Sequence, residues 1–204
     1  MTTPLETRED AYRDVIRTGR IKMLLIMLVC AAPIIASYVT YYFLKPQGRT
    51  NSGELVLPVK PVPPAQLRTL DGKPYDFAAF KGKWVMLTVD GGACPEACVA
   101  KLYKIRQVRA VQGKDADRVE QVWLIDDEAQ LETRVIRAYD ATHMLRAAGT
   151  PLLSALPPAA GGALRDHIYV IDPLGNLVLR FPKDALPEKM KKDLERLLKY
   201  SGIG

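Results

Sequence analysis

The feature that most constrains this 204-residue chain is an uncharged run of 22 residues near its start, Met23 to Leu44. A helix of roughly 20 apolar residues is long enough to cross the hydrocarbon core of a membrane. A cleavable signal peptide has a shorter apolar region that ends at a small-residue cleavage site, whereas this run continues well past Cys30. We therefore predict an N-terminal segment at 1–22 and a transmembrane helix at 23–44, with Cys30 as an apolar membrane residue.

The charges that flank this run predict its orientation. Basic residues are more numerous before the run than just after it: Arg8, Arg13, Arg17, Arg20 and Lys22 precede it, and Lys45 and Arg49 follow it. Because cytoplasmic flanks carry the excess of Lys and Arg, the N-terminus is expected in the cytoplasm. Acidic residues in the same segment argue against an organellar transit peptide. The simplest setting is a single-pass protein of a bacterial inner membrane with a periplasmic domain, where a pair of cysteines can form a disulfide.

The rest of the chain divides by composition. Residues 45–64 contain five prolines and are expected to form an extended tether. Residues 65–204 are long enough for one ordinary domain. Their positive and negative charges are interspersed, and no basic stripe with interleaved aromatic residues occurs, so we see no case for a nucleic-acid partner.

Hydrophobic patterning in 65–204 predicts an α/β fold. The expected elements are a hairpin at 67–77, a buried strand at 84–89, a helix at 95–111, a strand at 119–126, a helix at 128–148, a loop at 149–166, a hairpin at 167–181 and an amphipathic helix at 187–200. An early strand–helix–strand crossover and a late hairpin indicate a mixed sheet with flanking helices. A cysteine pair where a strand meets a helix, as at 94–98, is the thioredoxin-like arrangement.

The cysteine pair carries the expected chemistry. Cys94 and Cys98 are separated by three residues, and Pro95 is suited to the first helical position. Residues four apart lie on one side of a helix, so both sulfurs can point the same way. A helix N-terminus lowers the pKa of a thiol, and thiolates are reactive and bind soft metals. Two thiolates suit Cu(I), and a neutral imidazole would complete a three-coordinate site.

The chain has two histidines that could supply this imidazole. His143 lies in the predicted second helix and is expected to be a surface or packing residue. His167 lies between a loop rich in Pro and Gly and the strand that follows. In thioredoxin-type folds the start of that strand packs beside the tip of the cysteine-bearing helix. We therefore expect His167 to be the third metal ligand and Asp166 to orient its ring by accepting a hydrogen bond from it.

These motifs resemble the Sco family (Sco1/SenC), copper-handling assembly factors of cytochrome c oxidase. The resemblance rests on "CPEAC" after a strand and on "DHIYVIDPLGNLVLRF" some seventy residues later. It implies one membrane span, a thioredoxin-like domain, and copper, as Cu(I) or Cu(II), on Cys94, Cys98 and His167. It also implies partners among oxidase subunit II and other oxidase assembly factors. Val99 stands where Sco proteins commonly have proline, which marks a divergent member.

Three functions remain open at this point. The first is a metallochaperone that assists assembly of the copper centre of cytochrome c oxidase. The second is a thiol–disulfide oxidoreductase, in which Cys94 is the exposed nucleophile and Cys98 is the resolving thiol, without a metal. The third, a purely structural disulfide, is the weakest, because closing so short a loop constrains the unfolded chain little.

Overall fold

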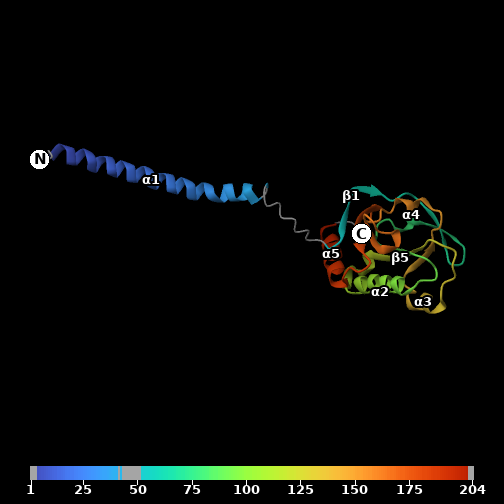
Figure 1. Ribbon diagram of the computed structural model, residues 1–204. Coiled ribbons are helices and arrows are strands. Elements are labelled where there is room, and N and C mark those ends of the chain that lie inside the picture. Colours follow the sequence, from blue (N-terminus) through green and yellow to red (C-terminus); the bar gives the residue numbers. More distant parts are fainter. Residues whose placement is uncertain (1–3, 41, 43–51, 202–204) are drawn as a thin grey trace. The chain divides into compact units, whose positions relative to one another are not determined.

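The computed structural model describes residues 4–40, 42 and 52–201, and the chain divides into two units, Met1–Arg49 and Thr50–Gly204. In the first unit, helix α1 covers Pro4–Val39 (Figure 1). Its stretch Arg17–Val39, 23 residues, is long and apolar enough to cross a membrane. This agrees with a single-pass anchor. The end of the expected span, at 41 and 43–44, and the first part of the expected tether, at 45–51, lie outside the described residues.

The second unit is built on one eight-stranded sheet with the strand order β1-β8-β7-β4-β5-β6-β2-β3 (Figure 1). The strands are β1 Glu54–Pro61, β2 Gln66–Thr69, β3 Pro74–Asp76, β4 Trp84–Asp90, β5 Val119–Ile125, β6 His143–Arg146, β7 His167–Ile171 and β8 Asn176–Pro182. Strand β4 pairs in parallel with β5 and antiparallel with β7, so the sheet is mixed.

Helices lie on both faces of this sheet. They are α2 Glu96–Ala110, α3 Thr133–Ala138, α4 Pro151–Ala155 and α5 Pro187–Tyr200, with short 3₁₀ helices η2 Phe77–Phe80, η3 Gly113–Arg118 and η4 Leu164–Asp166. Buried residues of α2 and α5 share one cluster with β4 and β7, and η2 and α4 contribute to the cluster on the opposite face. The predicted α/β, thioredoxin-like fold is confirmed.

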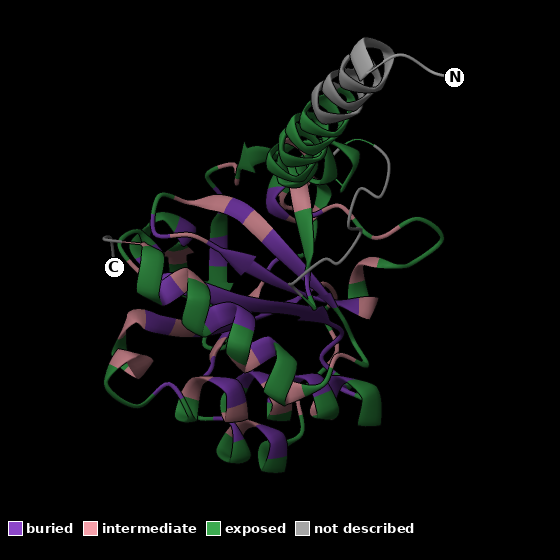
Figure 2. Ribbon diagram, turned by 90° about the vertical axis from the view of Figure 1, so that its left-hand side faces the viewer, coloured by how far each residue is buried: buried purple, intermediate pink, exposed green. Residues whose placement is uncertain are grey.

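The middle of the sheet is buried on both faces. Every residue of β4 and β7 is buried, and Figure 2 shows the central strands buried along their length. Because successive side chains of a strand point to opposite faces, Met86 belongs to the cluster that contains Ile105 of α2, while Leu87 belongs to the cluster that contains Leu152 of α4. The near-continuous apolar run of β4 is therefore explained by burial from two sides.

The helix expected at 128–148 is wrong. Only Thr133–Ala138 is helical there, and His143–Arg146 forms strand β6, parallel to β5. Met144 and Leu145 are both buried, and they pack in clusters on opposite faces of the sheet. Two adjacent apolar residues that are buried on opposite faces fit a strand between two layers. A helix would bury only one of its sides, so the helical reading of this segment was wrong.

The extended tether expected at 45–64 is wrong for residues 54–61, which form edge strand β1 against β8. Prolines are tolerated on an edge strand because one side of it makes no ladder hydrogen bonds. The entry to this strand is fixed by Asp193 of α5, whose carboxylate accepts the N–H groups of Ser52 at 2.6 Å and Gly53 at 2.9 Å.

The second unit also carries its own hydrophobic core. The buried members of all three core clusters fall within residues 65–198, whereas the described side chains of α1 are almost all exposed. Since burial of apolar surface is the dominant favourable term in folding, a fragment of residues 50–204 has what it needs to fold by itself.

Candidate functional site

The loop that carries the cysteines depends on two glycines. Strand β4 ends at Asp90, and Gly91 and Gly92 lead into the turn before α2. A side-chain carbon on Gly91 would overlap the carboxylate of Asp127, and one on Gly92 would overlap the carbonyl oxygen of Ala129. Glycine at both positions therefore lets the cysteine loop lie directly against the segment that follows β5.

The two cysteines form a disulfide at the tip of α2, with their Cα atoms 5.1 Å apart. Cys98 is fully buried, and Cys94 is buried but 7% exposed. Pro95 is the N-cap residue, so α2 begins at Glu96, one residue later than expected. Cys94 has a φ of 38°. A partner thiol can reach Cys94 more readily than Cys98, which agrees with the roles expected for a nucleophile and a resolving thiol.

A buried ion pair lies behind the cysteine loop. Lys101 of α2 and Asp90 of β4 are 1% and 5% exposed, and their Nζ and Oδ2 atoms are 2.5 Å apart. The Lys101 ammonium also donates to the carbonyl oxygens of Val89, at 2.9 Å, and of Arg165. Burial raises the pKa of Asp90 and lowers the pKa of Lys101. The pair ties together the end of β4, helix α2 and the segment before β7.

A second charged group closes the other side of the loop. Arg165 makes a two-pronged contact with Asp126, at 2.9 and 2.6 Å, and lies 3.6 Å from Asp127. The Asp127 carboxylate accepts the N–H of Gly92 at 2.8 Å, and this hydrogen bond lowers the pKa of Asp127. The hydrogen bond to Asp126 raises the pKa of Arg165. The cysteine loop is thus held by charged side chains on two sides.

His167 lies on the opposite face of the sheet from α2. It begins β7, in which Ile168 and Val170 pack in the cluster that contains Ile105 of α2. Side chains alternate along a strand, so His167 shares the other face with Tyr169, and their ring centroids are 5.9 Å apart. The sequence located the strand correctly but did not reveal which face its first residue occupies.

Both ring nitrogens of His167 are already used. Nδ1 is 2.9 Å from the carbonyl oxygen of Ala163, and the N–H of Ala159 lies 3.3 Å from Nε2. A carbonyl can only accept, so Nδ1 carries the proton and the Nε2 lone pair accepts from Ala159. The ring is 5% exposed. In this arrangement His167 is a neutral imidazole that holds the 159–163 loop and has no lone pair free for a metal.

Asp166 and His143 also have other partners. The Asp166 carboxylate contacts Lys183 at 2.6 Å and accepts the N–H of Ala163 at 3.0 Å, and Lys183 lowers the pKa of Asp166. The Nδ1–H of the His167 ring donates to the Ala163 carbonyl and not to the Asp166 carboxylate that was expected to orient the ring. His143, in β6, contacts Glu120 at 3.2 Å and packs against the ring of Phe80, which agrees with a packing role.

The structure therefore brings together Cys94 and Cys98 but not His167. Within the described part of the chain, no group of three or more His, Cys, Asp or Glu side chains is placed to hold a metal ion. The buried Lys101–Asp90 pair was missed. Its signal was present, since Lys101 falls on the stripe of α2 that also contains Cys98, Leu102 and Ile105, and a lysine inside an apolar stripe requires a buried partner.

Three solved structures illustrate what this chain is similar to. Copper-bound ScoI of Bradyrhizobium japonicum is 25% identical with a TM-score of 0.50, and the alignment covers 67% of this chain and 99% of that one. Apo Sco1 of Thermus thermophilus is 22% identical with a TM-score of 0.56, over 74% and 99%. Copper-bound yeast Sco1 is 17% identical with a TM-score of 0.54, over 70% and 90%. No curated protein matches the chain.

The family comparison covers more than half of the chain. The model described as "Transmembrane-like, thioredoxin-like, C-terminal domain" matches residues 84–201, which run from β4 through the cysteine loop to the end of α5. The three solved structures share the fold of the second unit. The chain belongs to this transmembrane-like, thioredoxin-like family, and its domain has the fold of the Sco proteins.

Proposed function

We propose that this chain is a membrane-anchored protein that handles copper through Cys94 and Cys98 and assists assembly of the copper centre of cytochrome c oxidase. One observation carries the proposal: the cysteine pair sits at the tip of α2 in a domain that shares its fold, and 25% of its residues, with a Sco protein solved with copper bound. Copper is the cargo of this protein rather than a resident cofactor.

Reduction of the disulfide is the first step. A dithiol partner attacks Cys94, forms a mixed disulfide, and then leaves as its own disulfide. Two electrons and two protons are transferred to the cysteine pair, which becomes two thiols. Binding of Cu(I) then displaces the thiol protons, because thiolate is the ligand form. Soft thiolates select Cu(I) over harder divalent ions, so the reduced pair supplies the right donors.

The proposed ligand set contains the two thiolates and omits His167. To join them, His167 would have to give up its contacts with Ala159 and Ala163 and move to the other face of the sheet. Asp166 would likewise have to leave Lys183 to support the ring. A two-thiolate set also leaves copper open to a ligand from the acceptor, as transfer between proteins requires.

The location and client belong to the same proposal. The basic residues before the apolar helix favour a cytoplasmic N-terminus, which would place the domain in the periplasm of a bacterium with the helix in the inner membrane. A tethered domain meets other membrane proteins at a raised effective concentration. Subunit II of the oxidase, or another oxidase assembly factor, is the proposed acceptor.

The test is a competition titration of the reduced 50–204 fragment with Cu(I) against a chromophoric chelator. We expect one Cu(I) per domain, with binding lost in Cys94→Ser and in Cys98→Ser. Cys30 is absent from this fragment, so it cannot contribute a thiol. A fragment that binds no Cu(I) when its two thiols are shown to be free would refute the proposal.

A second candidate is thiol–disulfide exchange without metal, and the observed disulfide favours it. Its test is reduction of a disulfide-bonded substrate peptide in the presence of a strong copper chelator. Activity that persists with the chelator and disappears in Cys94→Ser would support this function. The two functions can coexist, because copper loading and disulfide reduction both require the reduced pair.

A further inference from the structure

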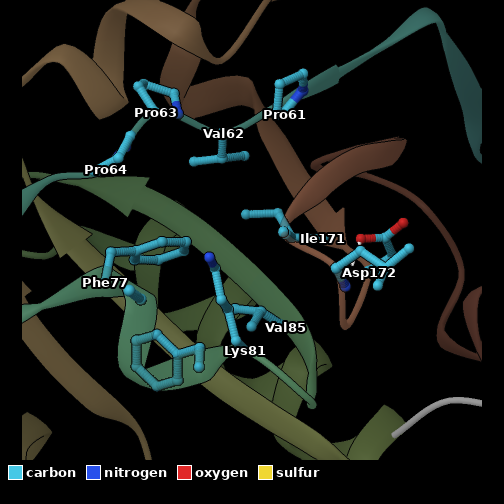
Figure 3. Close-up of a pocket in the computed structure, with 13 residues that line it drawn as sticks. Pro61, Val62, Pro63, Pro64, Phe77, Lys81, Val85, Ile171 and Asp172 are labelled. Atoms are coloured by element: carbon cyan, nitrogen blue, oxygen red, sulfur yellow. Dashed lines mark hydrogen bonds between the residues drawn. The ribbon is translucent and has the colours of Figure 1, made fainter.

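A cavity of about 260 Å³ lies on the face of the sheet away from α2 (Figure 3). Its floor is made by Val85 of β4 and Ile171 of β7, whose neighbours in the strands, Met86 and Val170, pack toward α2. The alternation of side chains along a strand therefore separates this cavity from the cysteine pair by the thickness of the sheet. The proposed copper function makes no use of it.

The walls of the cavity are apolar and held in place by the backbone. One wall is the segment Pro61–Pro64, and another is Phe77 of η2. Two hydrogen bonds attach these walls to the β7–β8 turn: the N–H of Val62 donates to Gly175 at 2.8 Å, and the N–H of Gly82 donates to Pro173 at 2.9 Å. The prolines add rigidity because their rings fix φ. The cavity is thus largely preformed, as ligand sites usually are.

One positive charge, the ammonium of the exposed Lys81, lies at the mouth of this apolar space. The ammonium end of Lys81 lies between Phe77, Val62 and Ile171 in Figure 3. Among the residues that the structure describes, Lys81 has no ion-pair or side-chain hydrogen-bond partner. The acidic residue of the lining, Asp172, is otherwise engaged: its carboxylate accepts the N–H groups of Leu174 at 3.0 Å and Asn176 at 2.7 Å.

We propose that this cavity binds a small amphipathic carboxylate, with its apolar body between the prolines and Phe77 and its carboxylate on Lys81. Apolar walls favour a ligand that buries hydrocarbon, and the Lys81 ammonium at the mouth favours a negatively charged group. Because the Asp172 carboxylate is held by three hydrogen bonds of the turn and Lys81 is not, an anion gains more from this lining than a cation or an uncharged alcohol.

The test is a titration of the 50–204 fragment with octanoate, followed by amide chemical shifts. We expect saturable shifts that centre on Val62, Phe77 and Lys81 and spare the cysteine loop. Octylammonium should produce no such saturable shifts, and 1-octanol should bind more weakly than octanoate. Shifts that are scattered over the surface, or that do not saturate, would overturn the proposal.

Three variants sharpen the test. Lys81→Met keeps the apolar stem but removes the charge, and it should weaken octanoate binding about fivefold, since the ion pair at the cavity mouth is partly solvated. Lys189→Met, which removes an exposed lysine of α5, is the matched control and should change nothing. Ala78→Phe should fill the cavity and abolish binding. Equal octanoate affinity in Lys81→Met and the wild type would overturn the assignment of the carboxylate.

The carboxylate proposal can be tested independently of the copper proposal. The double variant Cys94→Ser, Cys98→Ser cannot bind Cu(I) through its thiols, but it should keep its octanoate affinity. Loss of octanoate binding in that variant, with the fold intact by its amide spectrum, would contradict the separation of the two sites.

Discussion

The cysteine loop and the start of β7 lie at neighbouring strands of one sheet but are built in opposite ways. The cysteine loop projects toward the face that carries α2, and it is held by charged side chains, Lys101 with Asp90 and Arg165 with Asp127. His167 turns to the other face, and it is held by two backbone groups. Closeness along the sheet therefore does not place two side chains in one site, because the strand's alternation decides which face each occupies.

Among the variants that test this comparison, Lys101→Met is expected to change the free energy of unfolding most. Removal of one partner of a buried ion pair leaves an uncompensated charge and typically costs about 3–5 kcal/mol. We expect a loss of unfolding free energy of this order, because Asp90 would stay buried without its counter-charge. The measurement is urea unfolding of the 50–204 fragment.

The control for that variant is the double change Asp90→Leu, Lys101→Met. Replacement of a buried ion pair by apolar residues of similar size is often neutral, so most of the lost free energy should return. A single variant as stable as the wild type would show that the pair does not hold the cysteine loop.

The next effect compares one glycine from each region. Gly92→Ala should destabilise the domain by about 2–3 kcal/mol, because its new methyl group overlaps the carbonyl oxygen of Ala129, a backbone atom that cannot move away as a side chain can. Gly162→Ala places its methyl group 3.1 Å from Cε1 of His167, a side-chain atom that can shift by a few tenths of an ångström. Its cost should be clearly smaller. Thermal unfolding of both variants measures the difference, and equal melting temperatures would contradict it.

A smaller effect on stability is expected from His167→Ala. It removes a buried ring and leaves the N–H of Ala159 and the carbonyl of Ala163 without partners, at a cost of about 1–2 kcal/mol. His167→Asn, which can accept and donate, should recover part of this loss. Amide exchange at Ala159 should become faster in His167→Ala, while the N–H of Gly92 should keep its protection. Faster exchange at both would mean that the regions are coupled.

The smallest effect is a pH dependence in the cysteine loop. The pKa of Asp127 is lowered in the folded protein by the N–H of Gly92. A lowered pKa contributes stability that is present above the unfolded value of 3.8 and is lost as the pH falls through the folded value. Because Asp127 is 38% exposed, the change should stay under about 1 kcal/mol.

Protection of the Gly92 amide measures this dependence. Its protection factor should fall as the pH is lowered from about 4 to about 2 in the wild type, and it should change less in Asp127→Asn, which keeps an accepting oxygen. A protection factor that is flat over this range would remove Asp127 from the account.

Much of the fold was predictable because its signals are local. The apolar run of β4, the turn glycines, the amphipathic pattern of α5 and the D-P-x-G-N hairpin each specify an element within a few residues. Strand β6 was not predictable in this way. It has four residues with one apolar side chain on each face, which is too few to show a hydrophobic periodicity. Strand β1 was hidden by its prolines, since its place at the sheet edge depends on contacts with β8 that are distant in sequence.

The cysteine pair could be predicted from sequence, but the position of the histidine could not. A cysteine pair after a strand and a small-residue turn lies at a helix tip whatever the rest of the fold does. His167 occupies a strand with apolar residues at every following position, so its pattern could not tell the two faces apart. Lys101 could have been recognised as buried, but the identity of its partner depends on how β4 and α2 pack.

X-ray absorption at the copper edge tests the central claim most directly. The sample is the reduced 50–204 fragment loaded with one equivalent of Cu(I), next to the same sample of His167→Ala. We expect sulfur neighbours, no outer-shell scattering from an imidazole, and the same spectrum for both samples. An imidazole signature that disappears in His167→Ala would contradict this expectation, and would mean that β7 and its preceding loop rearrange to bring this ring to the cysteine pair.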